Sequence, residues 1–219
     1  MSLLDLAKAM VKDESGKLAD PFDYNDSISA ALKRYSRSRP QTKVEDLAGN
    51  ASHDLDLPAS WTADFSTIVT LEYPIGSIPA TILTGDAWQF YRTPSGTKIR
   101  LIYDKPAVSS AVRCEYTLLH DETTLPVSDL EAVAALAASF CLRRLAAIYG
   151  QTSDSSIQAD VVNYRSKSDE YRRLADSYEE VYNKALGLRK DDGVAPAMAS
   201  TGPVATDRTR MTHGRGSWR

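Results

Sequence analysis

Cysteine, histidine and long apolar runs are scarce in this chain of 219 residues, and each scarcity excludes a class of protein. The two cysteines, Cys114 and Cys141, lie in apolar periodic segments, which favours buried thiols over a structural disulfide. No run approaches the roughly 18 consecutive apolar residues of a membrane-spanning helix. Asp5 interrupts what would be the apolar region of a signal peptide. We therefore expect a soluble globular protein with no membrane partner.

Motifs that carry chemistry are also missing. None of the three histidines has a second histidine, a cysteine or a carboxylate at a metal-ligand spacing, so no metal site is expected. The chain has no glycine-rich phosphate loop and no GxSxG motif, so no nucleotide or other cofactor is expected. The densest group of acids and bases, His120-Asp121-Glu122, falls on a predicted turn, where solvated side chains are the rule. We predict that the chain is not an enzyme. A carboxylate-based hydrolase stays open as an alternative, because carboxylates that meet in space need no local spacing.

Charge is distributed unevenly along the chain. The net charge of −3 divides into +3 for residues 188–219 and −6 for residues 1–187. The C-terminal segment has only three residues of the Leu, Ile, Val and Phe group, too few to bury a core, so we expect an extended basic tail that is ordered only by partners. Arginine with a neighbouring aromatic suits either nucleic acid or carboxylates and apolar slots on a protein. A charge of +3 gives only weak, salt-sensitive binding of DNA, so we assign the tail to a protein partner through Arg208, Arg210, Arg215, Trp218 and Arg219.

The first 41 residues are predicted to be helical. Apolar spacing indicates a short helix over residues 3–11 and a second helix from about Asp23 to Ser38. The second helix ends in the cations Lys33, Arg34, Arg37 and Arg39. These side chains either complement the helix dipole or form a partner-binding patch.

Residues 42–125 change to a period of two, which is typical of strands. We predict four antiparallel strands over residues 66–73, 87–93, 97–103 and 111–118, and two weaker ones over residues 42–47 and 53–57. Pro94-Ser95-Gly96 predicts a hairpin with a bulged turn. The apparent loop after the first strong strand is apolar. It either packs under the sheet or contacts another component through Ile75, Ile78 and Ile82.

Residues 126–187 return to a helical period. Ser128 and Glu131 have the spacing of a capping box, and an alanine-rich, buried helix is predicted to run to Tyr149 with Gly150 as its C-terminal cap. A last helix begins between Asp154 and Asp160 and ends at Gly187, and it packs antiparallel to the previous one. Its tyrosines either cover the chain's own core or form a subunit interface, which we assign to Tyr164, Tyr171, Tyr178 and Tyr182.

Together these patterns predict an α+β fold in four parts. Residues 1–41 join a helical bundle, residues 42–125 form a β-rich insertion with at least four antiparallel strands, and residues 126–187 form the long helical hairpin of the bundle. Residues 188–219 form the tail.

Several segments resemble the head-to-tail connector, or adaptor, proteins of tailed bacteriophages. The resemblance covers about residues 20–187. It is carried by ISAALKRYSRSRP at residues 28–40, by LP at 57–58 with Trp61 and Phe65, by LEYPIG at 71–76 with Trp88 and Tyr91, and by QTSDSSI at 151–157 with YRSKSDEY at 164–171. Such adaptors are helical bundles, so the β-rich insertion departs from the smaller members of the family.

The resemblance implies a structural role in the virion. A protein of this family forms a homo-oligomeric ring, usually of twelve copies, between the portal protein and the next tail component in the neck. The ring closes the DNA-filled head and docks the tail, and genomic DNA passes through without specific binding. The protein would be made in the host cytoplasm, and its tail would bind the portal or a neighbouring subunit. An oligomeric scaffold unrelated to phage, or a nucleic-acid-binding module, shares many of these sequence features and stays open.

Overall fold

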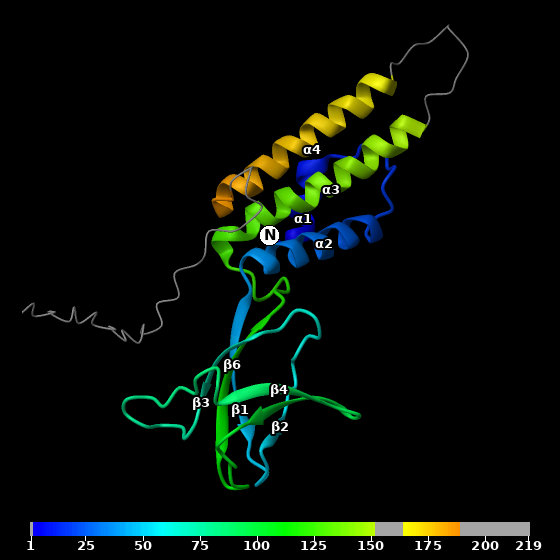
Figure 1. Cartoon of the computed structure of the whole chain (residues 1–219). Helices are drawn as coiled ribbons and strands as arrows, with labels where there is room; N and C mark the ends of the chain where they lie inside the picture. The colour runs from blue at the N-terminus through cyan, green and yellow to red at the C-terminus, as the bar shows by residue number, and fades with distance from the viewer. Residues whose placement is uncertain (1, 152–163, 189–219) are drawn as a thin grey trace, which may run out of the picture.

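The computed structural model describes residues 2–151 and 164–188 of the chain, with the side chains of residues 164–166 left out. These residues form an α+β fold with a helical bundle at one end and a β-rich part at the other (Figure 1). The described part of the chain contains four α-helices and two three-stranded sheets. The predicted fold class is confirmed at this level.

The first two helices lie where the apolar spacing predicts them. Helix α1 spans Leu3–Val11, and the side chains of Ser2 and Asp5 each bond the other residue's backbone amide at its start. Helix α2 spans Phe22–Ser38 and buries one face, which includes Ile28, Leu32 and Tyr35. Its apolar face packs on the bundle core, as does that of α1, so both helices belong to the bundle.

Helices α3 (Leu130–Gln151) and α4 (Tyr164–Leu186) form the long antiparallel pair (Figure 1). A short 3₁₀ turn, Val127–Asp129, precedes α3, and the Ser128 hydroxyl donates to Asp129 instead of capping α3. Gly150 also differs from prediction, because it lies inside α3 and not at its cap. It lies beside Ser168 of α4, whose hydroxyl donates to the Ala146 carbonyl at 2.8 Å.

The predicted end of the last helix is confirmed. Gly187 has a left-handed φ of +70°, and its N–H donates to the Lys184 carbonyl. A glycine in this conformation is a common end of a helix. The predicted start between residues 154 and 160 lies outside the described residues.

Helix α3 is the core helix of the bundle. Within the described residues, Val127–Gln151 is the one segment long and apolar enough to cross a membrane by length and composition, and 72% of its apolar window is buried inside the protein. Its alanines let the other helices approach closely, while Leu136, Leu142 and Leu145 fill the interior. Burial of this kind is what a core helix requires.

The β-rich part is two antiparallel sheets that share one core. One sheet has the order β1 (Gln41–Ala48), β6 (Ala111–Leu118), β3 (Ile68–Glu72), and the other has the order β2 (Asp54–Asp56), β5 (Gly96–Leu101), β4 (Trp88–Thr93). The core contains side chains from both sheets, among them Leu47, Leu55, Leu71, Ile99 and Val112. The four strong strands and the two weaker ones are therefore all present. The β4–β5 turn is tighter than predicted, because Thr93 pairs directly with Gly96 and only two residues connect the strands.

The chain passes between the two parts twice, through residues 39–40 and residues 119–126. Ser36 accepts a hydrogen bond from the His120 amide at 2.8 Å, and the Tyr35 ring meets the His120 ring edge-on at 5.2 Å. Arg39 forms an ion pair with Asp129 at 2.8 Å. These contacts tie the end of α2 to both connections, so the two parts are held together by more than the chain itself.

Candidate interaction surfaces

The described residues offer little that resembles a catalytic site. No group of three or more His, Cys, Asp or Glu side chains that could hold a metal ion occurs in the described ranges. One surface hollow lies between α3 and α4 and is lined by Arg143, Ala147, Arg172 and Asp176. A second hollow lies beside β5 and is lined by Ser52, His53, Asp54, Gln89, Arg100, Leu101 and Ile102. In the second one Asp54 is bonded to Arg100 through both carboxylate oxygens, which leaves a neutral pair there, and the Nδ1 atom of His53 lies 2.9 Å from the Leu101 carbonyl oxygen.

The His120-Asp121-Glu122 cluster forms a structural turn. The Nδ1 atom of His120 lies 3.1 Å from the Thr124 carbonyl oxygen. Asp121 accepts hydrogen bonds from Thr123 and Thr124, which lower the pKa of its carboxyl to about 2. A carboxylate with such a pKa is a poor proton acceptor at neutral pH. These hydrogen bonds give the cluster a structural role in the turn that connects β6 to α3.

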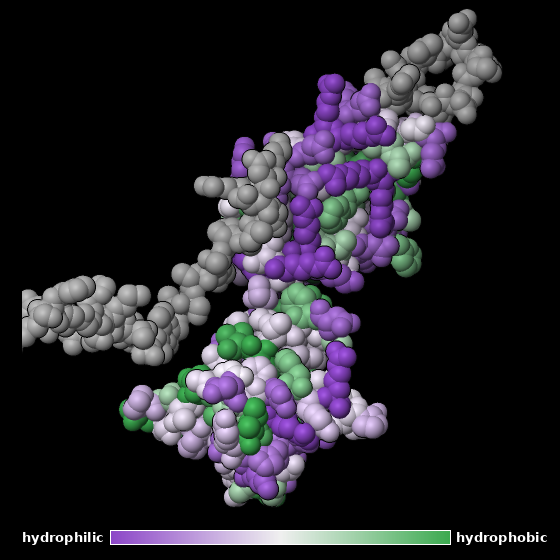
Figure 2. Space-filling model, viewed as in Figure 1, coloured by the Kyte–Doolittle hydropathy of each residue, from purple (hydrophilic) through white to green (hydrophobic). Residues whose placement is uncertain are grey.

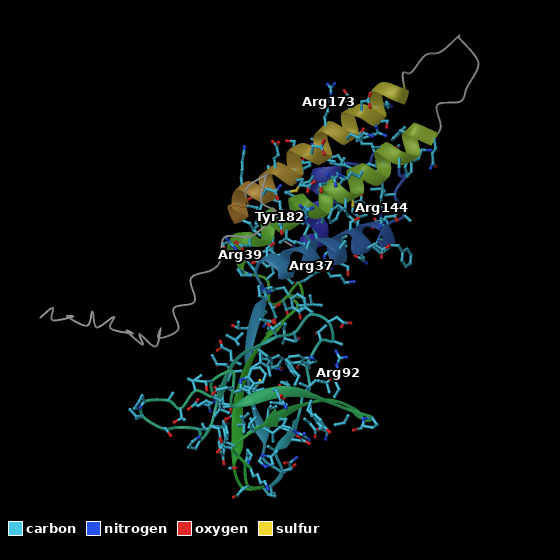
Figure 3. All side chains as sticks on the ribbon, in the orientation of Figure 1. Arg37, Arg39, Arg92, Arg144, Arg173 and Tyr182 are labelled. Atoms are coloured by element: carbon cyan, nitrogen blue, oxygen red, sulfur yellow. The ribbon has the colours of Figure 1, made fainter. Side chains whose placement is uncertain are left out.

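The basic end of α2 is partly used inside the chain. Arg34 forms an ion pair with Glu179 of α4 at 2.7 Å, and Arg39 pairs with Asp129. Lys33 and Arg37 are exposed, and Figure 3 shows Arg37 and Arg39 at the end of the bundle that meets the β-rich part. Of the four cations that end α2, two are therefore engaged within the chain, and Lys33 and Arg37 are left for a partner.

Three tyrosines of α4, Tyr171, Tyr178 and Tyr182, pack against the chain's own core. Tyr182 is fully buried, with the Arg34 guanidinium 5.7 Å from its ring centre, so it cannot serve the subunit interface that the sequence assigns to it. Tyr171 stacks on Tyr149 of α3 at 5.4 Å, and the Tyr178 hydroxyl donates to the Met10 carbonyl at 3.3 Å. These rings fill the gaps that the small side chains of α3 leave. The side chain of Tyr164 lies outside the described residues.

The outer surface of the bundle is charged, and many of its charges are paired. Arg143 of α3 binds Asp176 and Glu179 of α4, and Arg144 binds Asp23 of α2 at 2.8 Å. In Figure 2 the visible face of the bundle is predominantly hydrophilic, whereas hydrophobic patches are scattered over the β-rich part. A surface of satisfied ion pairs is unsuited to tight apolar contact.

The loop between β3 and β4 is the most exposed apolar segment described. Ile78 is 100% exposed and Ile82 is 48% exposed, while Ile75 is half-buried. No charged residue occurs from Tyr73 to Thr84. In Figure 1 this loop extends away from the sheets on one side of the β-rich part. Of the two interpretations that the sequence left open, packing under the sheet is wrong for Ile78, because none of its surface is covered.

The second exposed feature is strand β4 itself. Strand β4 lies at the edge of its sheet and pairs only with β5. Phe90 and Tyr91 are 46% and 36% exposed, and Trp61 packs against Phe90 with ring centres 5.7 Å apart. The residue pattern of 87–93 predicts this strand but not its place at a sheet edge, since position in a sheet depends on pairing with distant residues.

The basic tail cannot be placed on this structure. Arg208, Arg210, Arg215, Trp218 and Arg219 all lie outside the described residues. Their role stays a prediction from composition.

Comparison with known proteins gives only structural neighbours. No protein-family model and no curated protein matches the chain. Among solved structures, it is similar to a chain of the virion of the native gene transfer agent particle, at 14% identity and a TM-score of 0.30, covering 78% of this chain and 89% of that one. It is also similar to a chain of the neck of the native particle computed with C12 symmetry, at 16% identity and a TM-score of 0.28, covering 76% and 88%. A third similar chain comes from the neck of the empty particle computed with C6 symmetry, at 14% identity and a TM-score of 0.30, covering 78% and 88%. These three neighbours are thus chains of gene transfer agent particles and their necks.

Proposed function

We propose that this protein is a structural subunit of a virion neck, an adaptor that forms a ring between the portal protein and the tail of a phage-like particle. The ring closes the DNA-filled head and docks the tail, and the protein has no catalytic role. The motifs of residues 28–40, 71–76 and 164–171, which resemble those of phage adaptors, support this assignment.

One structural observation carries the proposal furthest. Ile78 and Ile82 are exposed on a projecting loop and Phe90 and Tyr91 on a free sheet edge, while charges on the bundle pair with one another. Apolar surface that a single chain leaves uncovered is typical of protein–protein contact. A surface suited to contacts between many copies is expected of a ring subunit more than of an enzyme.

The balance of charge suits a DNA conduit. Residues 1–187 carry −6, and a lumen that repels phosphate lets duplex DNA slide where a basic one would grip it. We assign the channel surface to this acidic body of the protein, residues 1–187, in which residues 42–125 carry −5. Tight binding of duplex DNA by a protein shortened to residues 1–187, at physiological salt, would contradict this assignment.

Electron microscopy of the purified full-length protein, alone and with candidate portal proteins, tests the ring. We expect closed rings of twelve copies that bind the narrow end of a portal. A protein that stays monomeric with every portal, or that holds a small metabolite in a dry crevice, would overturn the proposed function.

The tail is tested by deletion. We assign Arg208, Arg210, Arg215, Trp218 and Arg219 to contact with the portal or with a neighbouring subunit, which orders the tail and adds avidity around the ring. Removing residues 190–219 should prevent stable neck assembly. Normally assembled necks from the shortened protein would contradict this part of the proposal.

A further inference from the structure

Strand β4 presents unpaired backbone groups along its outer edge. The Ile102 amide donates to the Ala87 carbonyl at 2.8 Å, and the register then pairs Trp88 with Leu101 and Thr93 with Gly96. In an antiparallel ladder, hydrogen-bonded pairs alternate with pairs whose backbone groups point outwards. The N–H and C=O groups of Trp88, Phe90 and Arg92 therefore point away from β5, toward the free edge.

Within the described residues, this edge has little of the usual protection. Natural edge strands are shielded by proline, bulges or rows of charge. Strand β4 contains no proline, its pairing with β5 shows no register shift, and its one charged residue is Arg92. A six-residue edge of this kind is a template for another strand.

The loop after β3 presents a second free edge. The Tyr73 amide donates to the Thr81 carbonyl at 3.0 Å, and the Leu83 amide donates to the Leu71 carbonyl at 2.7 Å. These two bonds flank the Glu72–Ile82 bridge, so the backbone groups of Ile82 point away from β3. The segment Ala80–Leu83 is thus joined to β3 by an isolated bridge and has an open outer side at Ile82, whose side chain is half exposed.

The loop after β3 and the hairpin that carries β4 project in different directions from the β-rich part (Figure 1). In Figure 1 the loop after β3 extends to one side, and the tip of the β4–β5 hairpin extends to the other. Two different, mutually complementary surfaces on a subunit join copies head to tail, and a head-to-tail contact closes into a ring when its rotation allows. Both surfaces carry exposed apolar side chains, Ile78 and Ile82 on the loop and Phe90 and Tyr91 on β4, and the loop carries no charge that would have to be desolvated.

We propose that the segment Ala80–Leu83 of one copy adds to the free edge of β4 in the next copy, so that the β-rich parts are joined by an intermolecular sheet. The occupant of the β4 edge is a second copy of this chain, and Ile78 and Ile82 cover the exposed parts of Phe90 and Tyr91. This inference rests on the proposed ring, and it assigns the isoleucine loop to the neighbouring subunit and not to the next tail component.

Cross-linking of the full-length protein tests the contact. A protein with both Ile82→Cys and Gln89→Cys, treated with a short bismaleimide, should give a ladder of covalent oligomers, because each copy carries both halves of the contact. Each single variant should give no ladder. The native Cys114 and Cys141 are fully buried and do not compete for the reagent.

Each other result has a separate meaning. Covalent dimers from Gln89→Cys alone would show a two-fold β4–β4 contact and overturn the proposal. Closed wild-type rings in the electron microscope without a ladder would overturn this contact while the proposed function stands. A monomeric protein without a ladder would overturn both, and a ladder without closed rings would support the contact and contradict the ring.

A backbone variant supplies an independent test. Arg92→Pro removes an outward-pointing N–H without removing a β4–β5 hydrogen bond, and Arg92→Ala keeps that N–H. Mass measurement in solution should show that Arg92→Pro loses the oligomer and that Arg92→Ala keeps it, with matching circular dichroism spectra. If Arg92→Pro does not fold, Ile82→Glu replaces it, with Val108→Glu as the matched control at another exposed apolar position. An oligomer unchanged by either test variant would overturn the proposal.

Discussion

The hydroxyl of Tyr35 donates a hydrogen bond to Oδ2 of Asp129 over 2.6 Å, and this bond joins the last turn of α2 to the start of α3. The same carboxylate oxygen accepts from Arg39 at 2.8 Å. Burial raises the pKa of Tyr35, and the hydrogen bond to Asp129 raises it further. Burial acts to raise the pKa of Asp129 too, but the hydrogen bonds from Tyr35 and Arg39 outweigh it and hold that pKa below its usual value. The junction between the bundle and the β-rich part is therefore fixed by a charged hydrogen-bond network.

Removing the Tyr35 hydroxyl should destabilise the protein measurably. Tyr35 is 1% exposed, so Tyr35→Phe keeps the packing and deletes a hydrogen bond to a charged group, worth about 1.5–3 kcal/mol. Urea denaturation should show that loss in the free energy of unfolding. Tyr178→Phe is the control, since its hydroxyl makes a longer bond, 3.3 Å, from a half-buried position, and it should cost less. Equal losses in the two variants would contradict the importance of the junction.

The Asp129 carboxylate should stabilise the fold at neutral pH and lose that effect in acid. Its folded pKa lies below the unfolded value of about 4, so its contribution is present above that pH and is lost as the pH falls through the folded pKa. Urea denaturation from pH 7 to pH 3 should therefore show wild type more stable than Asp129→Asn at pH 7, with a difference that shrinks toward pH 3. A difference that stays constant across this range would contradict the lowered pKa.

Two glycines should respond in opposite ways to the same substitution. At Gly150, inside α3, an added Cβ would meet its nearest neighbour, Ser168 Oγ, at an ordinary 3.5 Å, so Gly150→Ala should raise stability by about 0.5–1 kcal/mol. At Gly49, just after β1, the added Cβ would lie 2.2 Å from the Ala107 carbonyl oxygen, so Gly49→Ala must displace backbone and should lower stability. Thermal unfolding of the two variants should show a raised melting temperature for Gly150→Ala and a lowered one for Gly49→Ala. A stabilised Gly49→Ala would refute the close approach of these two loops.

Both thiols should be unreactive in the folded protein. Burial raises the pKa of Cys114 to about 12 and also raises the pKa of Cys141, and the two side chains are fully buried. The thiolate is the reacting species, so a disulfide reagent at pH 8 should release almost no chromophore until urea is added. Two equivalents should then react. Rapid reaction of the native protein would show that the core around Cys114 in the β-rich part, or the core around Cys141 in the bundle, opens readily.

Local patterns in the sequence determined the helices and strands. The apolar spacing of residues 3–11 and 23–38 and the alternation in residues 111–118 were sufficient, because periodicities of 3.6 and 2 are set by the geometry of a single element. Composition also gave α3 its place in the core, since a helix that is apolar on most sides is stable only when it is covered.

Only the tertiary structure decided which residues that are far apart in the chain contact one another. The pairing of Gln41 with Leu118, and the exposure of β4 on the edge of its sheet, follow from contacts that no local pattern encodes. The α4 tyrosines show the same limit. A helical stripe identifies a face that will be covered, but whether its own chain or a second subunit covers it depends on where α1 and α3 pack, and here they bury Tyr182 completely. The physical reason is that helix and strand formation depends on neighbouring residues, whereas the burial of a face depends on the whole fold.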